Sequence, residues 1–197
     1  MNILSWNCRG LGNLRTIRDL CLLIKEKRPS LVFLMETKLR SKKMDLIRCK
    51  LGFNNLFVVD CVGKGGGLAL FWKEDIIVDI QNFSPRHIHG IVTSTTPLST
   101  HKWKFTGFYG QPDVARRHEG WDILKHLANF NPEPWLCIGD FNEVLYMSEK
   151  WGGGRRSNSQ MRNFQIAMEY CDFSDLGFKG PKFTWSNCRG EKDFIKE

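Results

Sequence analysis

Alternating apolar and polar runs along the chain predict a mixture of strands and helices. Residues 2–6 read as a short strand, and residues 14–27 show apolar side chains every three or four positions until Pro29 ends the helical pattern. The run SLVFLME, residues 30–36, is apolar almost throughout, as in a strand that is buried on both faces. A second helix is expected over residues 42–50.

The middle of the chain changes to a β-type pattern. Between residues 55 and 108, short runs rich in β-branched and aromatic residues alternate with turn residues, which suggests a meander. Residues 112–130 return to a helical pattern, residues 135–140 to a strand, residues 159–171 to a helix and residues 181–187 to a final strand. This order predicts an α/β chain with two packed mixed β-sheets and helices on their outer faces.

Composition places the chain among ordinary globular domains. Its 197 residues are 42% hydrophobic and 25% charged, which suffices to bury a substantial core in one domain. No apolar run approaches the roughly 18 residues of a membrane helix, and the amino terminus lacks a secretory pattern. The seven cysteines are odd in number and scattered, and they form neither a CxxC pair nor a zinc-like spacing, so we expect reduced thiols. We therefore expect a soluble monomer without a membrane partner in an intracellular compartment, nuclear or cytoplasmic.

The charge balance favours a polyanionic partner. Lys and Arg number 29 against 21 Asp and Glu, which gives a formal net charge of +8. Phosphates release counterions when basic side chains neutralise them, so nucleic acid is favoured over a membrane surface. Basic clusters at residues 38–43 and at Arg155 and Arg156 follow polar segments, which adds modestly to this reading. An ordinary solvated basic surface is the alternative.

Polar side chains follow four of the predicted strands. They are Asn7, Glu36, Tyr109 and the closely spaced Asp140 and Asn142. Residues two apart in extended backbone point to the same side, and α/β proteins tend to place their sites at the carboxyl ends of strands. Each residue alone has an ordinary structural explanation, so only the ordered set is informative. We expect the five to converge on one cleft.

Two glycine-rich segments need separate interpretation. The segment GKGGGLALFW, residues 63–72, lacks the residue order of a phosphate-binding P-loop and leads into a strand, so a hairpin turn is favoured. The segment KWGGGRRSNSQ, residues 150–160, is either a phosphate-contacting loop or an ordinary surface loop. Within it, Trp151 is a candidate for stacking on a nucleic-acid base.

Five motifs together carry a family resemblance. The segments ILSWNCRGLG, FLMETK, FYG, IGDFNEV and FTWSN, in this order, resemble the endonuclease/exonuclease/phosphatase superfamily. They are most similar to the apurinic-type endonuclease domain of plant LINE-type (non-LTR) retrotransposons. The resemblance covers the whole chain, and it implies one domain over residues 1–197 with the DNase I-like fold, a four-layer αββα sandwich. It also implies DNA as substrate and a fused or downstream reverse transcriptase in the full-length element.

The resemblance assigns catalytic roles to the residues at the strand ends. Glu36 would hold Mg²⁺, which Mn²⁺ can replace, with Asn7 beside it, since Mg²⁺ accepts one or two carboxylates and keeps several waters. Asp140 would orient or deprotonate the attacking water, and Asn142 would donate to a phosphate oxygen. Tyr109 would contact the phosphate or the leaving oxygen.

Four further residues are candidates for substrate binding. The resemblance places Thr184 near the site as a hydroxyl contact, and the second glycine-rich loop contributes Trp151, Arg155 and Arg156. Thr184 stands in the motif FTWSN, whereas the other three belong to the glycine-rich loop alone.

The resemblance also indicates what this sequence lacks. In the family, a strand with an R-L-D-R-like segment and a later Ser-Asp-His follow FTWSN, whereas this sequence ends in GEKDFIKE and none of its five histidines has that context. We therefore expect a domain that is incomplete at its carboxyl end, without the C-terminal strand or strands, and impaired in hydrolysis.

Three functions follow from these expectations. The first is a Mg²⁺-dependent phosphodiesterase of retroelement origin that nicks DNA as an endonuclease. The second is a catalytically dead remnant or a nucleic-acid-binding fragment. The third is a phosphatase of the same fold that acts on a phospholipid or an inositol phosphate, and the basic net charge argues against it.

Overall fold

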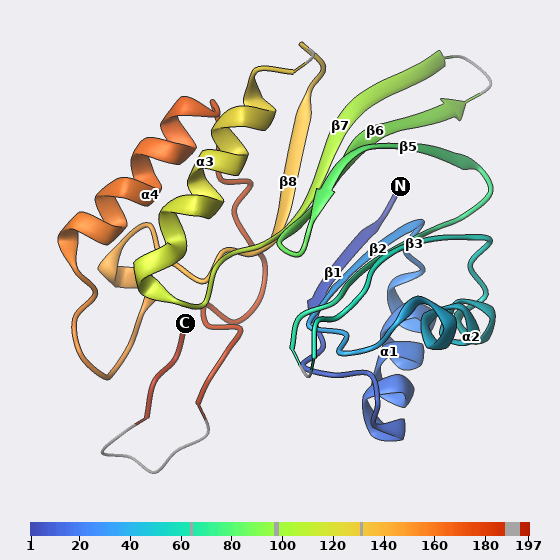
Figure 1. The fold of residues 1–197 in the computed structure, drawn as a ribbon, viewed down its shortest axis with the longest axis horizontal. Helices are drawn as coiled ribbons and strands as arrows, with labels where there is room; N and C mark the ends of the chain where they lie inside the picture. Colours follow the sequence, from blue (N-terminus) through green and yellow to red (C-terminus); the bar gives the residue numbers. More distant parts are fainter. Residues whose placement is uncertain (64, 97–98, 131, 188–193) are drawn as a thin grey trace. The chain divides into compact units, whose positions relative to one another are not determined.

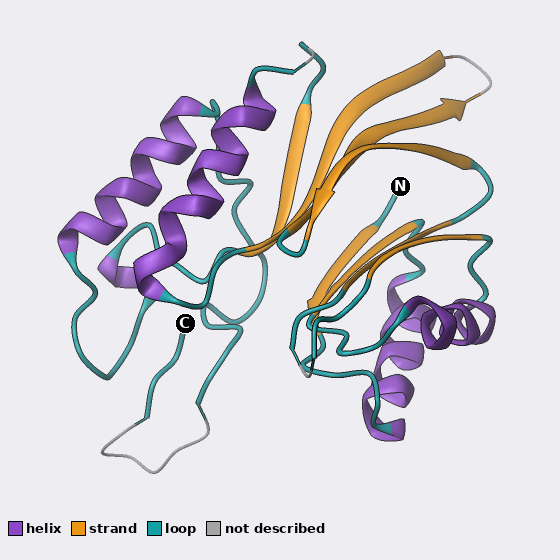
Figure 2. Ribbon diagram, viewed as in Figure 1, coloured by secondary structure: helices purple, strands orange, loops and turns teal. Residues whose placement is uncertain are grey.

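The computed structural model has an α/β fold with two four-stranded mixed sheets, as the sequence predicts (Figures 1 and 2). The chain divides into two compact units. The first comprises Met1–Tyr109 and Pro132–Asp140, and the second comprises Gly110–Asn131 and Phe141–Glu197. The structure describes residues 1–63, 65–96, 99–130, 132–187 and 194–197.

The first sheet has the strand order β1-β2-β4-β3, and β1 therefore lies at its edge. β1 runs parallel to β2, and the other neighbours are antiparallel. Helices α1 and α2 lie along one face of this sheet (Figure 1). The bounds are β1 (Ile3–Asn7), α1 (Leu14–Lys27), β2 (Leu31–Met35), α2 (Ser41–Leu51), β3 (Asn55–Val59) and β4 (Leu68–Trp72).

Helix α1 has the predicted bounds because both of its ends carry local signals. The Asn13 side chain accepts a hydrogen bond from the Arg15 amide, which caps the first turn. Arg28 takes a left-handed conformation at the other end and donates its amide to Ile24 O. Pro29 then prevents continuation.

The second sheet has the order β5-β6-β7-β8, with antiparallel pairs up to β7 and β8 parallel to β7. Only β5 to β7 form a meander, so the expectation of one meander from residue 55 to 108 is wrong for β3 and β4. Residues 68–71 of β4 are buried, which suits a strand with neighbours on both sides, and β4 lies between β2 and β3. The bounds are β5 (Ile76–Ser84), β6 (His87–Thr96), β7 (Ser99–Tyr109) and β8 (Trp135–Asp140).

The two faces of β2 pack into two separate cores. Val32 and Leu34 belong to the core beneath α1 and α2, while Leu31, Phe33 and Met35 join the core shared with the second sheet. This division explains the continuous apolar run in the sequence. Gly107 on β7 makes room for the Phe33 ring, since a Cβ there would lie 2.4 Å from the ring.

The second unit contains two packed helices, α3 (Arg117–Ala128) and α4 (Asn158–Tyr170) (Figure 2). The Trp121 ring stacks on the Phe164 ring with centroids 4.5 Å apart. Helix α3 starts later than residue 112, because Asp113 caps the short 3₁₀ turn η1 (Val114–Arg116) that precedes it. A second 3₁₀ turn, η2 (Met147–Glu149), lies before α4.

The predicted strand at residues 181–187 is not formed. Only an isolated bridge joins Ser186 to Lys196, although Thr184 and Trp185 also donate their amides to Glu197 O. This segment therefore pairs with residues 194–197 through a few hydrogen bonds instead of joining a sheet.

The sequence also predicts reduced cysteines and no membrane-spanning helix. The cysteines that the structure describes are free thiols, and Cys188 lies outside the described residues. Across the described part of the chain, no helix combines the length and apolar character needed to cross a bilayer.

Candidate functional site

Parallel strand pairs bring four of the predicted residues to strand ends in the first unit. Asn7 ends β1 and pairs in register with Met35, the last residue of β2, which Glu36 follows. Tyr109 ends β7 and pairs in register with Asp140, the last residue of β8. Because the members of each pair run in the same direction, their carboxyl ends coincide.

Asn7 links the two carboxylates. Its Nδ2 donates to Glu36 Oε1 and to Asp140 Oδ2, each at 2.9 Å. Its Oδ1 accepts the Arg9 amide at 3.3 Å, which fixes the amide orientation. One neutral amide thus holds two acidic side chains whose sequence positions are far apart.

Tyr109 is a neutral hydrogen-bond donor to the same carboxylate. Its hydroxyl donates to Glu36 Oε1 at 2.9 Å. Burial raises the pKa of Tyr109 well above its ordinary value, and the negative charge of Glu36, its hydrogen bond and the charge of Asp140 act in the same direction. The Arg86 guanidinium, 5.1 Å from the ring centroid, opposes this shift of the pKa only in part.

Cys8 packs beneath the Glu36 segment. Its amide and its thiol both donate to Met35 O at 3.1 Å. Burial raises the pKa of Cys8 to about 11, so the side chain is a protonated thiol and not a nucleophile.

The donor set suits a hydrated hard cation. Glu36 Oε1 accepts from Asn7 and Tyr109, while Oε2 lies 3.7 Å from Lys38 Nζ, and the Glu36 side chain remains 22% exposed. The described residues contain no group of three or more His, Cys, Asp or Glu side chains arranged around one metal position. Mg²⁺ takes one or two carboxylates and completes its shell with water, so the Glu36 carboxylate could serve as its protein ligand.

Asn142 belongs to the second unit. It has a left-handed backbone with φ 55°, and its Nδ2 donates to Gly110 O at 2.8 Å. Four of the five residues expected to converge are therefore joined by hydrogen bonds in the first unit, and Asn142 is held by contacts of its own.

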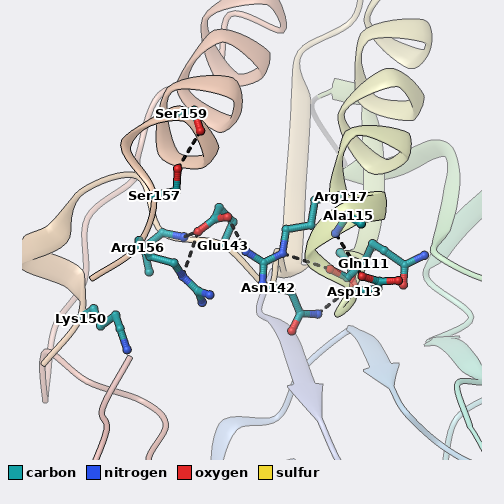
Figure 3. Close-up of polar contacts among 12 residues, drawn as sticks. Gln111, Asp113, Ala115, Arg117, Asn142, Glu143, Lys150, Arg156, Ser157 and Ser159 are labelled. Carbon is teal, nitrogen blue, oxygen red and sulfur yellow. Dashed lines mark hydrogen bonds and ion pairs between the residues drawn. The ribbon is translucent and has the colours of Figure 1, made fainter. Parts of the chain in front are cut away.

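A buried carboxylate follows Asn142 and organises part of the second unit (Figure 3). Glu143 is 1% exposed, forms an ion pair with Arg117 Nη1 and lies 3.1 Å from Arg156 Nε. Its Oε1 also accepts the Val144 amide at 3.0 Å. Arg156 further contacts Glu197 at 3.3 Å, so this predicted substrate-binding residue is held between two carboxylates.

The other predicted substrate-binding residues lie in the same unit. Arg155 is exposed, and Trp151 is 53% exposed with its ring against Phe194. Thr184 lines an open pocket of about 270 Å³. The remaining residues that line this pocket are Pro181, Lys182, Phe183, Trp185, Ser186 and Lys196.

Sequence reasoning assigned no role to Cys8, Arg117 or Glu143. The motif IGDFNEV contains Glu143, but nothing in the sequence pairs it with an arginine 26 positions earlier. These contacts arise only when the chain folds.

Comparison with protein families gives one match across nearly the whole chain. The model described as "Endonuclease/Exonuclease/phosphatase family" matches residues 4–192. No curated protein sequence matches the chain significantly.

Solved structures with the same fold include several nucleic-acid enzymes. The endonuclease domain of TRAS1, a telomere-specific non-LTR retrotransposon, superposes with a TM-score of 0.67 at 12% identity, covering 98% of this chain and 82% of that one. An AP endonuclease from Archaeoglobus fulgidus superposes with a TM-score of 0.63 at 14% identity, and the match covers 85% of this chain and 68% of that one. The 3′ phosphatase NExo from Neisseria, bound to a product DNA hairpin, superposes with a TM-score of 0.57 at 14% identity. The match covers 86% of this chain and 71% of that one. At these identities the likeness shows a shared fold, which is DNase I-like.

Proposed function

Because the chain belongs to the endonuclease/exonuclease/phosphatase family, we propose that it is a divalent-metal-dependent phosphodiester hydrolase of retrotransposon origin that nicks DNA. The observation that carries this proposal is the Asn7 amide bridging Glu36 and Asp140. That arrangement supports Glu36 as the proposed metal ligand and Asp140 as the proposed base at neighbouring strand ends.

Glu36 would hold Mg²⁺, and the metal when bound would neutralise charge on the phosphoryl group. Asn7 directs its Nδ2 to both carboxylates, so its contribution is to orient Glu36 and Asp140. Asp140 accepts the proton of the attacking water or orients that water.

Two neutral donors complete the proposed chemistry. Tyr109 retains its proton and orients the Glu36 carboxylate, and its hydroxyl is available to a phosphate or leaving oxygen. Asn142, whose Nδ2 donates to Gly110 O within the second unit, would supply a neutral amide to a phosphate oxygen.

DNA is the proposed substrate. The net charge of +8 favours a polyanion, and the Neisseria relative holds a DNA product. The TRAS1 domain comes from a non-LTR retrotransposon, which supports a reverse transcriptase as a partner in the same element. A phospholipid or inositol-phosphate substrate is less well supported by the basic charge.

Nicking of supercoiled plasmid tests this function. We expect slow conversion to the nicked form with Mg²⁺, abolished by a chelator and by Asp140→Ala. The exposed helical residue Asp19 provides a matched control, and Asp19→Ala should retain wild-type activity.

Undiminished nicking by Asp140→Ala would refute the proposed role of Asp140. DNA binding without any metal-dependent nicking would support the nucleic-acid-binding alternative. The absolute rate also tests the sequence-based expectation of impaired hydrolysis.

A further inference from the structure

The backbone at Glu36 departs from the regular ladder between β2 and β4. Met35 lies opposite Leu68, but beyond it Thr37 N donates to Gly67 O at 3.0 Å and Lys38 N to Gly66 O at 2.9 Å. These two bonds are shifted by one residue from the Met35 register. The ladder itself ends at Met35 and Leu68, and Glu36 is the residue left unmatched by the shift beyond it, in a bulge-like irregularity (the Glu36 bulge) that can redirect a side chain.

The bulge requires unusual backbone conformations. Glu36 and Lys38 have φ values of 52° and 53°, in the left-handed region that L-residues with a Cβ rarely adopt. Such conformations are strained and persist only where neighbouring contacts enforce them. The carbonyls of Gly66 and Gly67 accept from the two residues after Glu36, and Thr37 O accepts the Leu11 amide at 2.9 Å on the other side.

Gly67 has no room for a side chain. A Cβ would lie 2.4 Å from Thr37 Oγ1 and 3.3 Å from Lys38 N, and the φ of 88° is itself unfavourable for other residues. Gly66 has a φ of 70° but open space around the Cβ position. Gly65 has neither a left-handed φ nor an atom within 4 Å of its Cβ position.

We propose that Gly66 and Gly67 are positioning residues that hold the Glu36 bulge in the geometry required for metal binding. Their carbonyls fix Thr37 and Lys38, and the missing side chain at Gly67 lets Thr37 approach closely. The Glu36 carboxylate is thereby kept where Asn7 and Tyr109 can donate to it. The metal-binding part of this inference rests on the proposed function.

The three consecutive glycines allow a graded experiment on the whole chain. Gly65→Ala should leave all properties unchanged, Gly66→Ala introduces only backbone strain, and Gly67→Ala adds the contact with Thr37. For each variant we would measure hydrogen exchange at the Thr37 and Lys38 amides, Mn²⁺ affinity by water-proton relaxation, plasmid nicking and thermal unfolding.

We expect amide exchange at Thr37 and Lys38 to increase about tenfold or more in Gly67→Ala, by less in Gly66→Ala and not in Gly65→Ala. Mn²⁺ affinity and nicking should fall in the same order, by about 10–100-fold for Gly67→Ala, as for other residues that orient metal ligands. Exchange elsewhere in the first sheet should remain at the wild-type rate. Thr37→Ala added to Gly67→Ala removes the Oγ1 atom and should restore part of the protection and of the Mn²⁺ affinity.

Two results would overturn the inference. One is unchanged exchange at Thr37 and Lys38 in folded Gly67→Ala, and the other is an equal effect of Gly65→Ala. If Gly67→Ala does not fold, hydrogen exchange at the Thr37 and Lys38 amides of Gly66→Ala provides the test instead. Should wild type neither bind Mn²⁺ nor nick DNA, the proposed function fails, while the exchange data still decide whether the glycines hold the bulge.

Discussion

At the scale of single residues, the site is organised around one neutral amide. Two carboxylates at neighbouring strand ends repel each other unless something between them compensates. Asn7 does so by donating to both Glu36 and Asp140, and Tyr109 adds a second neutral donor to Glu36. Neutral donors satisfy the carboxylates without neutralising their charge, which is balanced in part by Lys38 Nζ, 3.7 Å from Glu36 Oε2.

Tyr109 gives a direct test of this electrostatic arrangement. Burial and the adjacent Glu36 raise its pKa, so its hydroxyl should remain protonated well above the ordinary tyrosine value of about 10. Ultraviolet titration of the folded protein should show one tyrosine of three ionising late. That late component should disappear in Tyr109→Phe. Three tyrosines that ionise together near pH 10 would contradict the observed contact with Glu36.

The sequence indicated these polar residues because each stands directly after an apolar run. Asn7, Glu36, Tyr109 and Asp140 could be found in this way, and parallel strand pairing explains why they meet. Gly67 could not be interpreted so readily. A glycine in a turn before a strand has many explanations, and its contact with Thr37 depends on the register between β2 and β4.

At the scale of elements, β6 carries two buried histidines. His87 lies between Ser84 and Asn82, and His89 contacts Thr106. Burial lowers the pKa of each to about 4, and the charge of Lys104 contributes to the shift at His89. Both imidazoles are therefore neutral in the folded protein near pH 7.

Because the pKa values of His87 and His89 are lowered, we expect the free energy of unfolding to decrease in acid. Unfolded histidine titrates near pH 6.5, so between pH 6.5 and 4 the unfolded state binds more protons and the free energy of unfolding falls as the pH falls. Each histidine should contribute up to about 1.4 kcal/mol per pH unit within that window. Urea unfolding at several pH values should show this slope, and it should be reduced in His89→Gln but not in the exposed-site variant His118→Gln. Equal slopes in all three proteins would contradict the prediction.

In the second unit, the loop after β8 is tied to α3 by a buried ion pair. Glu143 and the Arg117 side chain are 1% and 8% exposed. Glu143→Gln would leave Arg117 without its compensating charge, and we expect a loss of about 3–5 kcal/mol in the free energy of unfolding.

The exposed ion pair between Arg116 and Glu119, at the start of α3, provides the control. Glu119 is 44% exposed where it pairs with Arg116, so Glu119→Gln should cost far less stability than Glu143→Gln. Urea unfolding measures both variants. A cost for Glu143→Gln as small as that for Glu119→Gln would show that the buried pair contributes little.

Helices were easier to predict than the segment at residues 181–187. The 14–27 pattern is bounded by Asn13 and Pro29, so local residues fix both of its ends. Residues 181–187 have strand-like composition, but a strand also needs a partner along its length. Here the described partner is limited to residues 194–197, which give isolated bridges.

At the scale of the whole molecule, the family match and the fold agree with the positive charge. The chain has the DNase I-like fold, belongs to a family of nucleases and phosphatases, and carries a net charge of +8. Fold alone does not determine function, because one fold supports many chemistries. The proposed hydrolysis therefore depends on whether Glu36 binds a divalent cation.

Anomalous diffraction from crystals soaked with Mn²⁺ shows whether Glu36 holds a divalent cation. We expect one Mn²⁺ peak with a Glu36 carboxylate oxygen at roughly 2.1 Å, the distance typical of octahedral Mg²⁺ sites. The peak should be lost in Glu36→Gln crystals soaked under the same conditions. A Mn²⁺ peak away from Glu36, or one at Glu36 that persists in Glu36→Gln, would show that the Glu36 carboxylate is not the metal ligand.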